Sequence, residues 1–176
     1  MRTFVPSVLG LVALICMPSA ISARVASPTL AALSREADLI VLARVERISV
    51  ESPDVSIASS RVIEVWKGGQ ELSGGTVTFT ASSSIACDMS TATVGRLSVL
   101  FLERDKNQKA IRIAVSGRGQ MLINEVDGKS YASLMGVILP KELESLDKLS
   151  PREPGKGILA VEDLKGYVVR TLTKRR

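Results

Sequence analysis

The residue with the clearest chemical potential is Cys87, which lies among small hydroxyl side chains in the segment ASSSIACDMSTATVG, Ala81 to Gly95. A cysteine in this setting can act as a nucleophile, form a disulfide or fill space in a core. The sequence contains no histidine, which excludes Ser-His-Asp catalysis, Cys-His catalysis and the HExxH zinc motif. Cys87 is therefore not a histidine-activated nucleophile.

Catalysis without histidine would need other residues. Ser145 and Lys148 match the Ser-x-x-Lys spacing of penicillin-binding enzymes, but chance alone accounts for one such match in this chain, and the partner motifs are missing. Four carboxylates could converge in a fold, although their spacing does not indicate it: Glu64, Asp88, Glu103 and Asp105. A cell-envelope enzyme using carboxylate or Ser/Lys chemistry is thus the alternative function.

The first residues have the pattern of a secretory signal peptide. Arg2 supplies a positive charge, Val8 to Met17 is apolar, and Ile21-Ser22-Ala23 offers a small residue before a cleavage site. Beyond residue 23 no apolar run is long enough to span a bilayer as a helix. We therefore expect a protein without a transmembrane segment that is secreted to the periplasm or the extracellular space.

Cleavage after Ala23 would remove Cys16 and leave Cys87 as the single cysteine. An intrachain disulfide and a structural zinc site of the Cys/His type would then be excluded. Three roles remain: a buried residue that anchors the loop, an intermolecular disulfide, or a free thiol. We favour burial, because free cysteines are among the most often buried residues. A disulfide-linked or a non-covalent homodimer stays open.

The chain is basic, with a formal net charge of +5, and much of the surplus lies near the C-terminus. The cations there are Lys165, Arg170, Lys174, Arg175 and Arg176. Such a tail can attract anionic envelope surfaces or nucleic acid, or it can complete the macrodipole of a solvated helix end, which we favour. Because only 3% of the residues are aromatic, few side chains could stack on bases, and we expect no nucleic-acid partner.

The hydrophobic pattern indicates one short helix followed by strands. Ser27-Pro28 predicts a helix start, and Leu30, Leu33 and Ala37 follow at helical spacing. From Leu39 the period is two, through Leu39, Val41, Ala43 and Val45, and then Ile48 and Val50 continue out of phase. That change of phase predicts a β-bulge near Glu46 and Arg47.

Further strands are predicted over Val55 to Trp66, with Ile63 and Val65 inward, Thr76 to Thr80, Leu97 to Leu102, Ile111 to Val115 and Met121 to Val126. The apolar run Leu97 to Leu102 is typical of a strand covered on both faces. Lys67-Gly68-Gly69 ends the second strand, and Gly117 with Gly119 marks a turn or bulge. The core is therefore expected to be mainly β, with five or six strands.

The C-terminal third has a different pattern. Leu139 to Lys148 predicts a short helix, Ser150 to Gly157 a loop, and Val161, Leu164, Val168 and Leu172 a helical stripe that packs on the sheet. Gly166 lies within this last helix and lowers its propensity. The expected organisation is a signal peptide at 1–23, a helical lead-in at 24–38, a barrel at 39–130 and a helical extension at 131–176.

Four segments carry a family resemblance: EADLIVLARVERI (Glu36 to Ile48), RVIEVWKGG (Arg61 to Gly69), TVTFTASSSIACDMSTATVGRLSVLFLER (Thr76 to Arg104) and IRIAVSGRGQM (Ile111 to Met121). In their order they resemble bacterial secreted proteins of the TIMP-like, or netrin-module-like, OB-fold superfamily. The resemblance implies a five- to six-stranded, closed or partly open OB-like barrel with the Cys87 loop between the third and fourth strands. It also implies a binding module.

Animal TIMPs inhibit metalloproteases through an N-terminal cysteine that chelates the catalytic zinc. The expected mature start here, ARVASPTL, has no cysteine, so we do not expect this mode of inhibition. Many bacterial relatives also carry a cysteine before the first strand that could pair with the one in the loop, and this chain lacks it.

Two glycine-flanked motifs are candidates for the binding surface. Trp66-Lys67 could be an exposed aromatic anchor beside a cation, although we favour a tryptophan that caps the barrel end. Arg118 could be presented at the rim to an anionic group, or its glycines could simply form a bulge. With the loop residues Ser84 and Asp88, and the thiol of Cys87, these define the expected site. We therefore expect a non-catalytic module, without cofactor or metal, that binds an envelope or extracellular protein.

Overall fold

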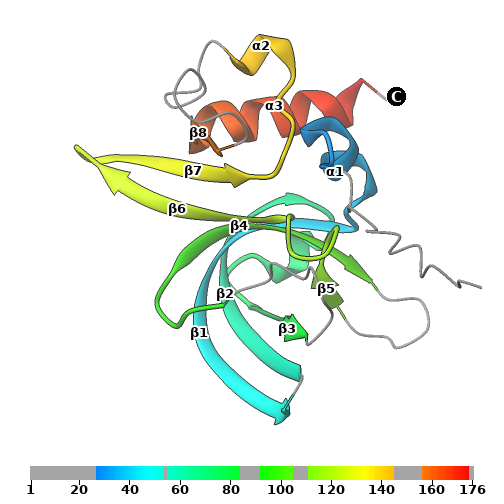
Figure 1. Ribbon diagram of the computed structural model, residues 1–176, viewed down its shortest axis with the longest axis vertical. Helices are drawn as coiled ribbons and strands as arrows, with labels where there is room; N and C mark the ends of the chain where they lie inside the picture. The colour runs from blue at the N-terminus through cyan, green and yellow to red at the C-terminus, as the bar shows by residue number, and fades with distance from the viewer. Residues whose placement is uncertain (1–26, 54, 84–91, 105–110, 145–155, 175–176) are drawn as a thin grey trace, which may run out of the picture.

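The structure is a computed structural model, and it describes residues 27–53, 55–83, 92–104, 111–144 and 156–174. Eight strands dominate this part of the chain (Figure 1). They are β1 (Leu39–Ser52), β2 (Val55–Lys67), β3 (Thr76–Ser83), β4 (Leu97–Arg104), β5 (Ile111–Ile113), β6 (Gln120–Val126), β7 (Lys129–Met135) and β8 (Lys156–Ala160). The helices are α1 (Leu30–Glu36), α2 (Lys141–Glu144) and α3 (Val161–Thr173), with a 3-10 turn at Gln70–Leu72. The predicted signal peptide and residues 84–91, which include Cys87, lie outside the described residues.

Five strands form a closed barrel. Their order is β1-β2-β3-β5-β4, and the pairing of β4 with β1 closes the circle. All neighbours are antiparallel except β3 and β5, which meet in parallel at Thr80 and Arg112. This is a five-stranded Greek-key barrel of the OB type, and it confirms the predicted fold class.

The long strand β1 serves two neighbours by bending. It pairs with β2 along its whole length and with β4 over residues 39–44. The register shifts between Val45 and Arg47, which places the predicted bulge at Glu46. The bulge therefore lets one strand of 14 residues belong to both sides of the barrel.

A second bulge corrects the prediction for β2. Ala43 pairs with Val62 and Leu42 pairs with Glu64, so Ile63 is the extra residue. Val62 is therefore buried in the barrel while Ile63 is 48% exposed, and the expected inward position of Ile63 is wrong. Beyond the bulge, Val65 packs half-buried against the barrel interior, as predicted.

The sheet continues beyond the barrel. β6 pairs with β4 over residues 98–100 and then leaves to pair with β7, which in turn pairs with β8 (Figure 1). Neither β7 nor β8 was predicted, because residues 131–176 were expected to be helical and Ser150 to Gly157 to be a loop. The turn between β6 and β7 is Asp127-Gly128, with φ of +51° and +72°.

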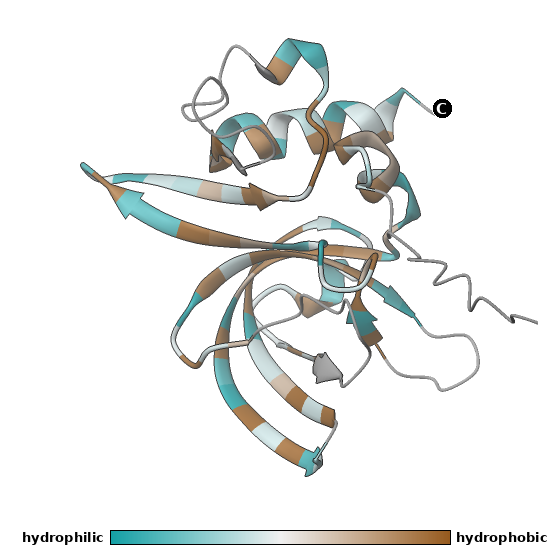
Figure 2. Cartoon of the chain, viewed as in Figure 1, coloured by the Kyte–Doolittle hydropathy of each residue, from teal (hydrophilic) through white to brown (hydrophobic). Residues whose placement is uncertain are grey.

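Two hydrophobic clusters lie on opposite faces of β4. Leu100 and Leu102 point into the barrel interior, whereas Val99 and Phe101 point to an outer cluster beneath the helices. We call these the barrel cluster and the helix-side cluster. The predicted double burial of this strand is confirmed, and Figure 2 shows the contrasting alternation of hydrophobic and hydrophilic residues along β1 and β2.

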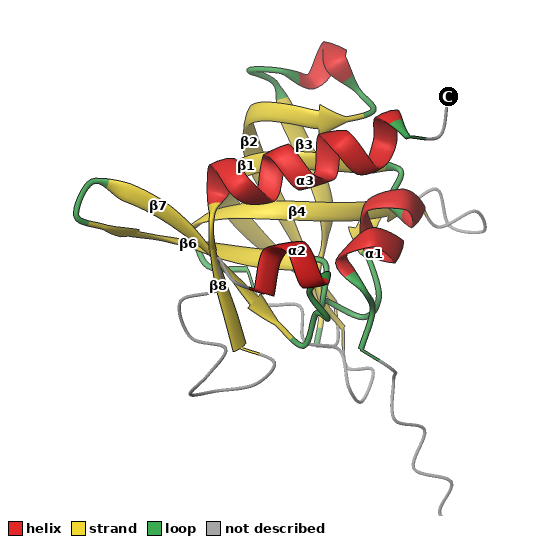
Figure 3. Cartoon of the chain, turned by 90° about the horizontal axis from the view of Figure 1, so that it is seen from above, coloured by secondary structure: helices red, strands yellow, loops and turns green. Residues whose placement is uncertain are grey.

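Helices α1 and α3 cover the outer face of the barrel and contact each other (Figure 3). α3 buries Leu164, Tyr167 and Val168, in agreement with the predicted stripe. α1 begins two residues later than expected, because the Thr29 hydroxyl, and not Ser27, accepts the capping hydrogen bond, from the Ala32 N–H. None of the described helices is long and apolar enough to cross a membrane.

Candidate functional site

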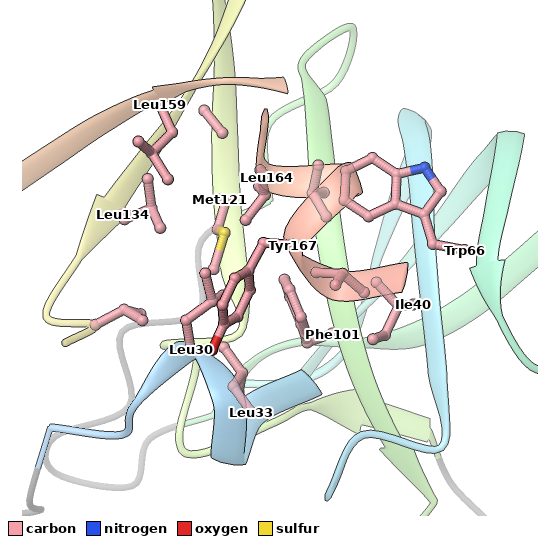
Figure 4. Packing of buried hydrophobic residues seen from close by; sticks show 14 of the residues in the cluster. Leu30, Leu33, Ile40, Trp66, Phe101, Met121, Leu134, Leu159, Leu164 and Tyr167 are labelled. Atoms are coloured by element: carbon pink, nitrogen blue, oxygen red, sulfur yellow. The ribbon is translucent and has the colours of Figure 1, made fainter. Parts of the chain in front are cut away.

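Trp66 is a core residue of β2 that packs beneath α3, outside the barrel interior. Its side chain is 7% exposed and belongs to the helix-side cluster (Figure 4). The indole Nε1 donates a hydrogen bond to Glu64 Oε2 at 3.0 Å. The exposed-anchor interpretation is therefore wrong for the ring as a whole, and Trp66 packs in the helix-side cluster and not in the barrel cluster.

The small accessible edge of Trp66 lies in an open hollow of about 320 Å³ lined by Val169, Leu172 and Thr173 of α3. We call this the Trp66 hollow. Val169 is 43% exposed, and Leu172 packs half-buried against the helix-side cluster. The hollow therefore offers an apolar floor at the surface, with the indole edge at one side.

Glu64 connects β2 to α3 at the margin of this hollow. Its Oε1 accepts a hydrogen bond from Lys165 Nζ, while Oε2 accepts the one from Trp66. Burial alone would raise the pKa of the Glu64 carboxyl, but the hydrogen bonds from Lys165 and Trp66 and the charge of Lys165 outweigh it. The pKa of Glu64 consequently lies below its usual value.

This arrangement gives a pH-dependent contribution to stability. The unfolded chain binds a proton at Glu64 near pH 4.3 (about the usual glutamate value), and the folded pKa is lower, so the stabilisation is present above that pH and is lost as pH falls through the folded pKa. Glu64→Gln is expected to lower the free energy of unfolding at pH 7 by less than about 1 kcal/mol, since the pair is partly exposed. The difference from wild type should vanish in acid.

Emission from Trp66, the only tryptophan, is expected to follow the same titration in acid pH scans of the folded protein, because the indole donates to the Glu64 carboxylate. Glu46→Gln is the matched control, because it breaks another partly exposed ion pair, to Arg61 at 2.6 Å, far from the indole in the fold. The control should keep the acid response of Trp66, and Glu64→Gln should abolish it. An unchanged response in Glu64→Gln would contradict the assignment.

Lys67 caps the C-terminus of α1. Its Nζ donates hydrogen bonds to the carbonyl oxygens of Ser34 at 3.2 Å and Arg35 at 2.7 Å, and also to that of Ala37. An ammonium at the negative end of a helix satisfies carbonyls that lack intrahelical partners. Lys67 therefore joins the barrel to α1, and this contact occupies its charged head.

Arg118 lies in the turn between β5 and β6, with its side chain beside Gly136. Gly119 is required there, because a β-carbon would lie 2.7 Å from the carbonyl oxygen of Phe101. Val115 and Ser116 in the same turn have φ of +50°. A glycine-dependent turn, the alternative to a presented arginine, thus shapes this segment.

The other predicted residues divide into two groups. Glu103 pairs with Arg112 at 2.7 Å on the barrel, apart from the Glu64 pair. Outside the described residues lie Ser84, Cys87, Asp88, Asp105, Ser145 and Lys148. The structure therefore brings Trp66 and Lys67 to the two helices and Arg118 to a separate turn.

A second hollow, of about 250 Å³, lies at the surface among the three helices. Its lining residues are Ala31, Arg35, Glu142, Tyr167, Arg170, Thr171 and Lys174. We call it the cationic hollow. Sequence reasoning had placed Arg170 and Lys174 at a helix end but missed Arg35, whose approach depends on the packing of α1 against α3. The only signal in the sequence was a cation in the last turn of each helix.

Comparison with models of known protein families and with curated proteins gave no match. Among the described residues, no three side chains of the His, Cys, Asp and Glu types gather in an arrangement that could hold a metal ion.

Proposed function

We propose that this chain is a secreted, non-catalytic binding module of the TIMP-like OB-fold type, and that its partner is an envelope or extracellular protein. The observation that carries the proposal is the Trp66 hollow, where the indole edge lies beside the exposed side chain of Val169 and the half-buried side chain of Leu172. Apolar depressions at the surface frequently receive the anchoring side chains of a partner in protein interfaces. The OB-like barrel supports it, because this architecture commonly presents binding surfaces.

The rigidity of the hollow also favours binding. Trp66 is fixed by Glu64, and Glu64 is fixed by Lys165, so both walls of the hollow are connected through one ion pair. A preformed surface loses little side-chain freedom when a partner docks. At about 320 Å³ the hollow matches the lower end of ligand-pocket sizes, roughly 300 Å³, which suits one or two apolar side chains of a partner.

The test is capture of partners from an envelope extract, under non-reducing conditions, with the immobilised protein. Val169→Asp places a charge in the hollow and is expected to abolish capture of the partner while changing the free energy of unfolding by less than about 0.5 kcal/mol. Val126→Asp is the matched control, because Val126 is 55% exposed on the distant β6–β7 turn.

Capture that survives Val169→Asp would place the partner surface elsewhere. Equal loss in Val126→Asp would show that the added charge, rather than the hollow, prevents capture. Turnover of peptidoglycan, peptide or ester substrates by the purified protein would instead favour the enzymatic alternative.

A further inference from the structure

We propose that the cationic hollow binds a small dianionic group of the phosphate type. This site goes beyond the proposed function, since it lies on a different side of α3 from the Trp66 hollow. At about 100° per residue, Tyr167, Arg170, Thr171 and Lys174 share one flank of the helix, while Val169, Leu172 and Thr173 share the opposite flank. The buried stripe of α3 separates the two.

Three exposed cationic residues from two helices line this hollow. Arg170 and Lys174 lie one turn apart on α3, and Arg35 comes from the last turn of α1. Glu142 is the one carboxylate among the lining residues, so the lining has a net charge of +2. Within the described part of the chain, neither Arg170 nor Lys174 forms a side-chain ion pair, and Arg35 uses only Nε, to the Ala31 carbonyl oxygen at 3.1 Å.

Two hydroxyl groups add uncharged donors. Tyr167 is 7% exposed, and its ring reaches from α3 toward α1, with the hydroxyl oxygen beside Leu30 (Figure 4). Thr171 follows one turn later on the same flank of α3. Buried packing of the Tyr167 ring fixes the position of its donor, which an anion at the hollow could use.

Completion of the α1 macrodipole does not account for the presence of Arg35 at this hollow. The C-terminal carbonyls of α1 already receive the ammonium of Lys67. The guanidinium of Arg35 therefore keeps its two terminal nitrogens for another acceptor. A dipole role also makes a different prediction, namely that removing the cations lowers stability without altering any response to anions.

The composition and size of the hollow indicate the class of ligand. Guanidinium groups bind phosphate oxygens in a bidentate manner, and a net lining charge of +2 matches a dianion better than a single carboxylate. The volume, about 250 Å³, is below that of most pockets for whole ligands, which begin near roughly 300 Å³. We therefore expect the cationic hollow to bind the phosphate group itself, either as free phosphate or as the phosphate of a monoester.

The test uses isothermal titration of the full protein with inorganic phosphate at constant ionic strength. The double variant Arg170→Gln/Lys174→Gln is expected to weaken phosphate binding by about tenfold or more, because it removes two charge-assisted contacts. Arg47→Gln/Lys129→Gln is the matched control, with the same change in net charge at exposed positions on β1 and β7. The control should bind phosphate within about twofold of wild type.

Other outcomes overturn the proposal. These are equal weakening in both double variants, and lower stability of Arg170→Gln/Lys174→Gln with unchanged phosphate affinity. A second arm uses glycerol phosphate and vesicles of phosphatidylcholine with phosphatidic acid, which present the same monoester free and on a surface. Binding to the vesicles without binding to glycerol phosphate would mean that Arg35, Arg170 and Lys174 contact a membrane surface, and it would refute a site for the phosphate group. Partner capture is read separately through Val169→Asp, so failure here leaves the proposed function intact.

Discussion

Replacing Phe101 with alanine is expected to lower the free energy of unfolding by about 3–5 kcal/mol. Phe101 is fully buried in the helix-side cluster, between the barrel and the two helices. Its backbone also pairs with the β5–β6 turn, since its N–H donates to Gly119 O and its carbonyl accepts from Ala114. A cavity at this point therefore removes contacts from the barrel, the turn and both helices. Urea denaturation followed by circular dichroism measures the loss.

Leu100→Ala is the matched control for this prediction. Leu100 is also fully buried, but it points into the barrel cluster. We expect a comparable loss of about 2–5 kcal/mol, with native Trp66 emission in the folded variant. Phe101→Ala should instead shift that emission, because both residues belong to the helix-side cluster. Identical emission in the two variants would contradict the division of the core by β4.

The second large effect is expected at Gly68, where alanine should cost roughly 2–4 kcal/mol. Gly68 has φ of +63°, and a β-carbon there would lie 2.6 Å from the carbonyl oxygen of Asp38. Asp38 cannot yield easily, because its N–H donates to Leu102 O at 2.8 Å and its carboxylate accepts from the Arg104 N–H at 2.8 Å. The substitution therefore strains the junction between α1 and β1.

Gly74→Ala separates the cost of the left-handed backbone from the cost of the close contact that is expected at Gly68. Gly74 has φ of +75°, and nothing lies within 4 Å of the position of its β-carbon. Only the left-handed backbone opposes alanine there, so the expected loss is roughly 1 kcal/mol. Thermal unfolding of both variants measures the difference. Equal losses of stability in the two variants would mean that the close approach of Gly68 to Asp38 adds nothing to the cost of the substitution.

Much of the barrel could be predicted because its signals are local. The change of phase along β1, the continuous apolar run of β4 and the stripe of α3 each follow from the burial of neighbouring residues. β7 was missed although Asp127-Gly128 is a strong two-residue hairpin signal. The strand that follows has short or polar side chains at several positions, so its apolar alternation is weak. β8 is only five residues long, and the predicted loop overlapped its first two residues.

The site was harder to predict, because its geometry depends on contacts between distant segments. Trp66 and Lys67 were identified as singular residues, but their roles depend on α3 and α1, which lie far away in sequence. Their neighbours Glu64 and Lys165 are separated by 101 positions. Local sequence patterns carry no information on such pairs. For the same reason they could not predict that Arg35 and Arg170 line one hollow.

The contact between α1 and α3 has a consequence for how the chain acquires its structure. These are the first and last elements of the described chain, yet they cover the same cluster side by side (Figure 3). Leu30 and Leu33 precede Leu164 and Val168 by nearly the whole described chain, so the cluster they share is complete only when both ends have come together. The barrel can pair its strands before then, but the outer face of β4 remains open to water. We therefore expect closure of this face to be a late step of folding.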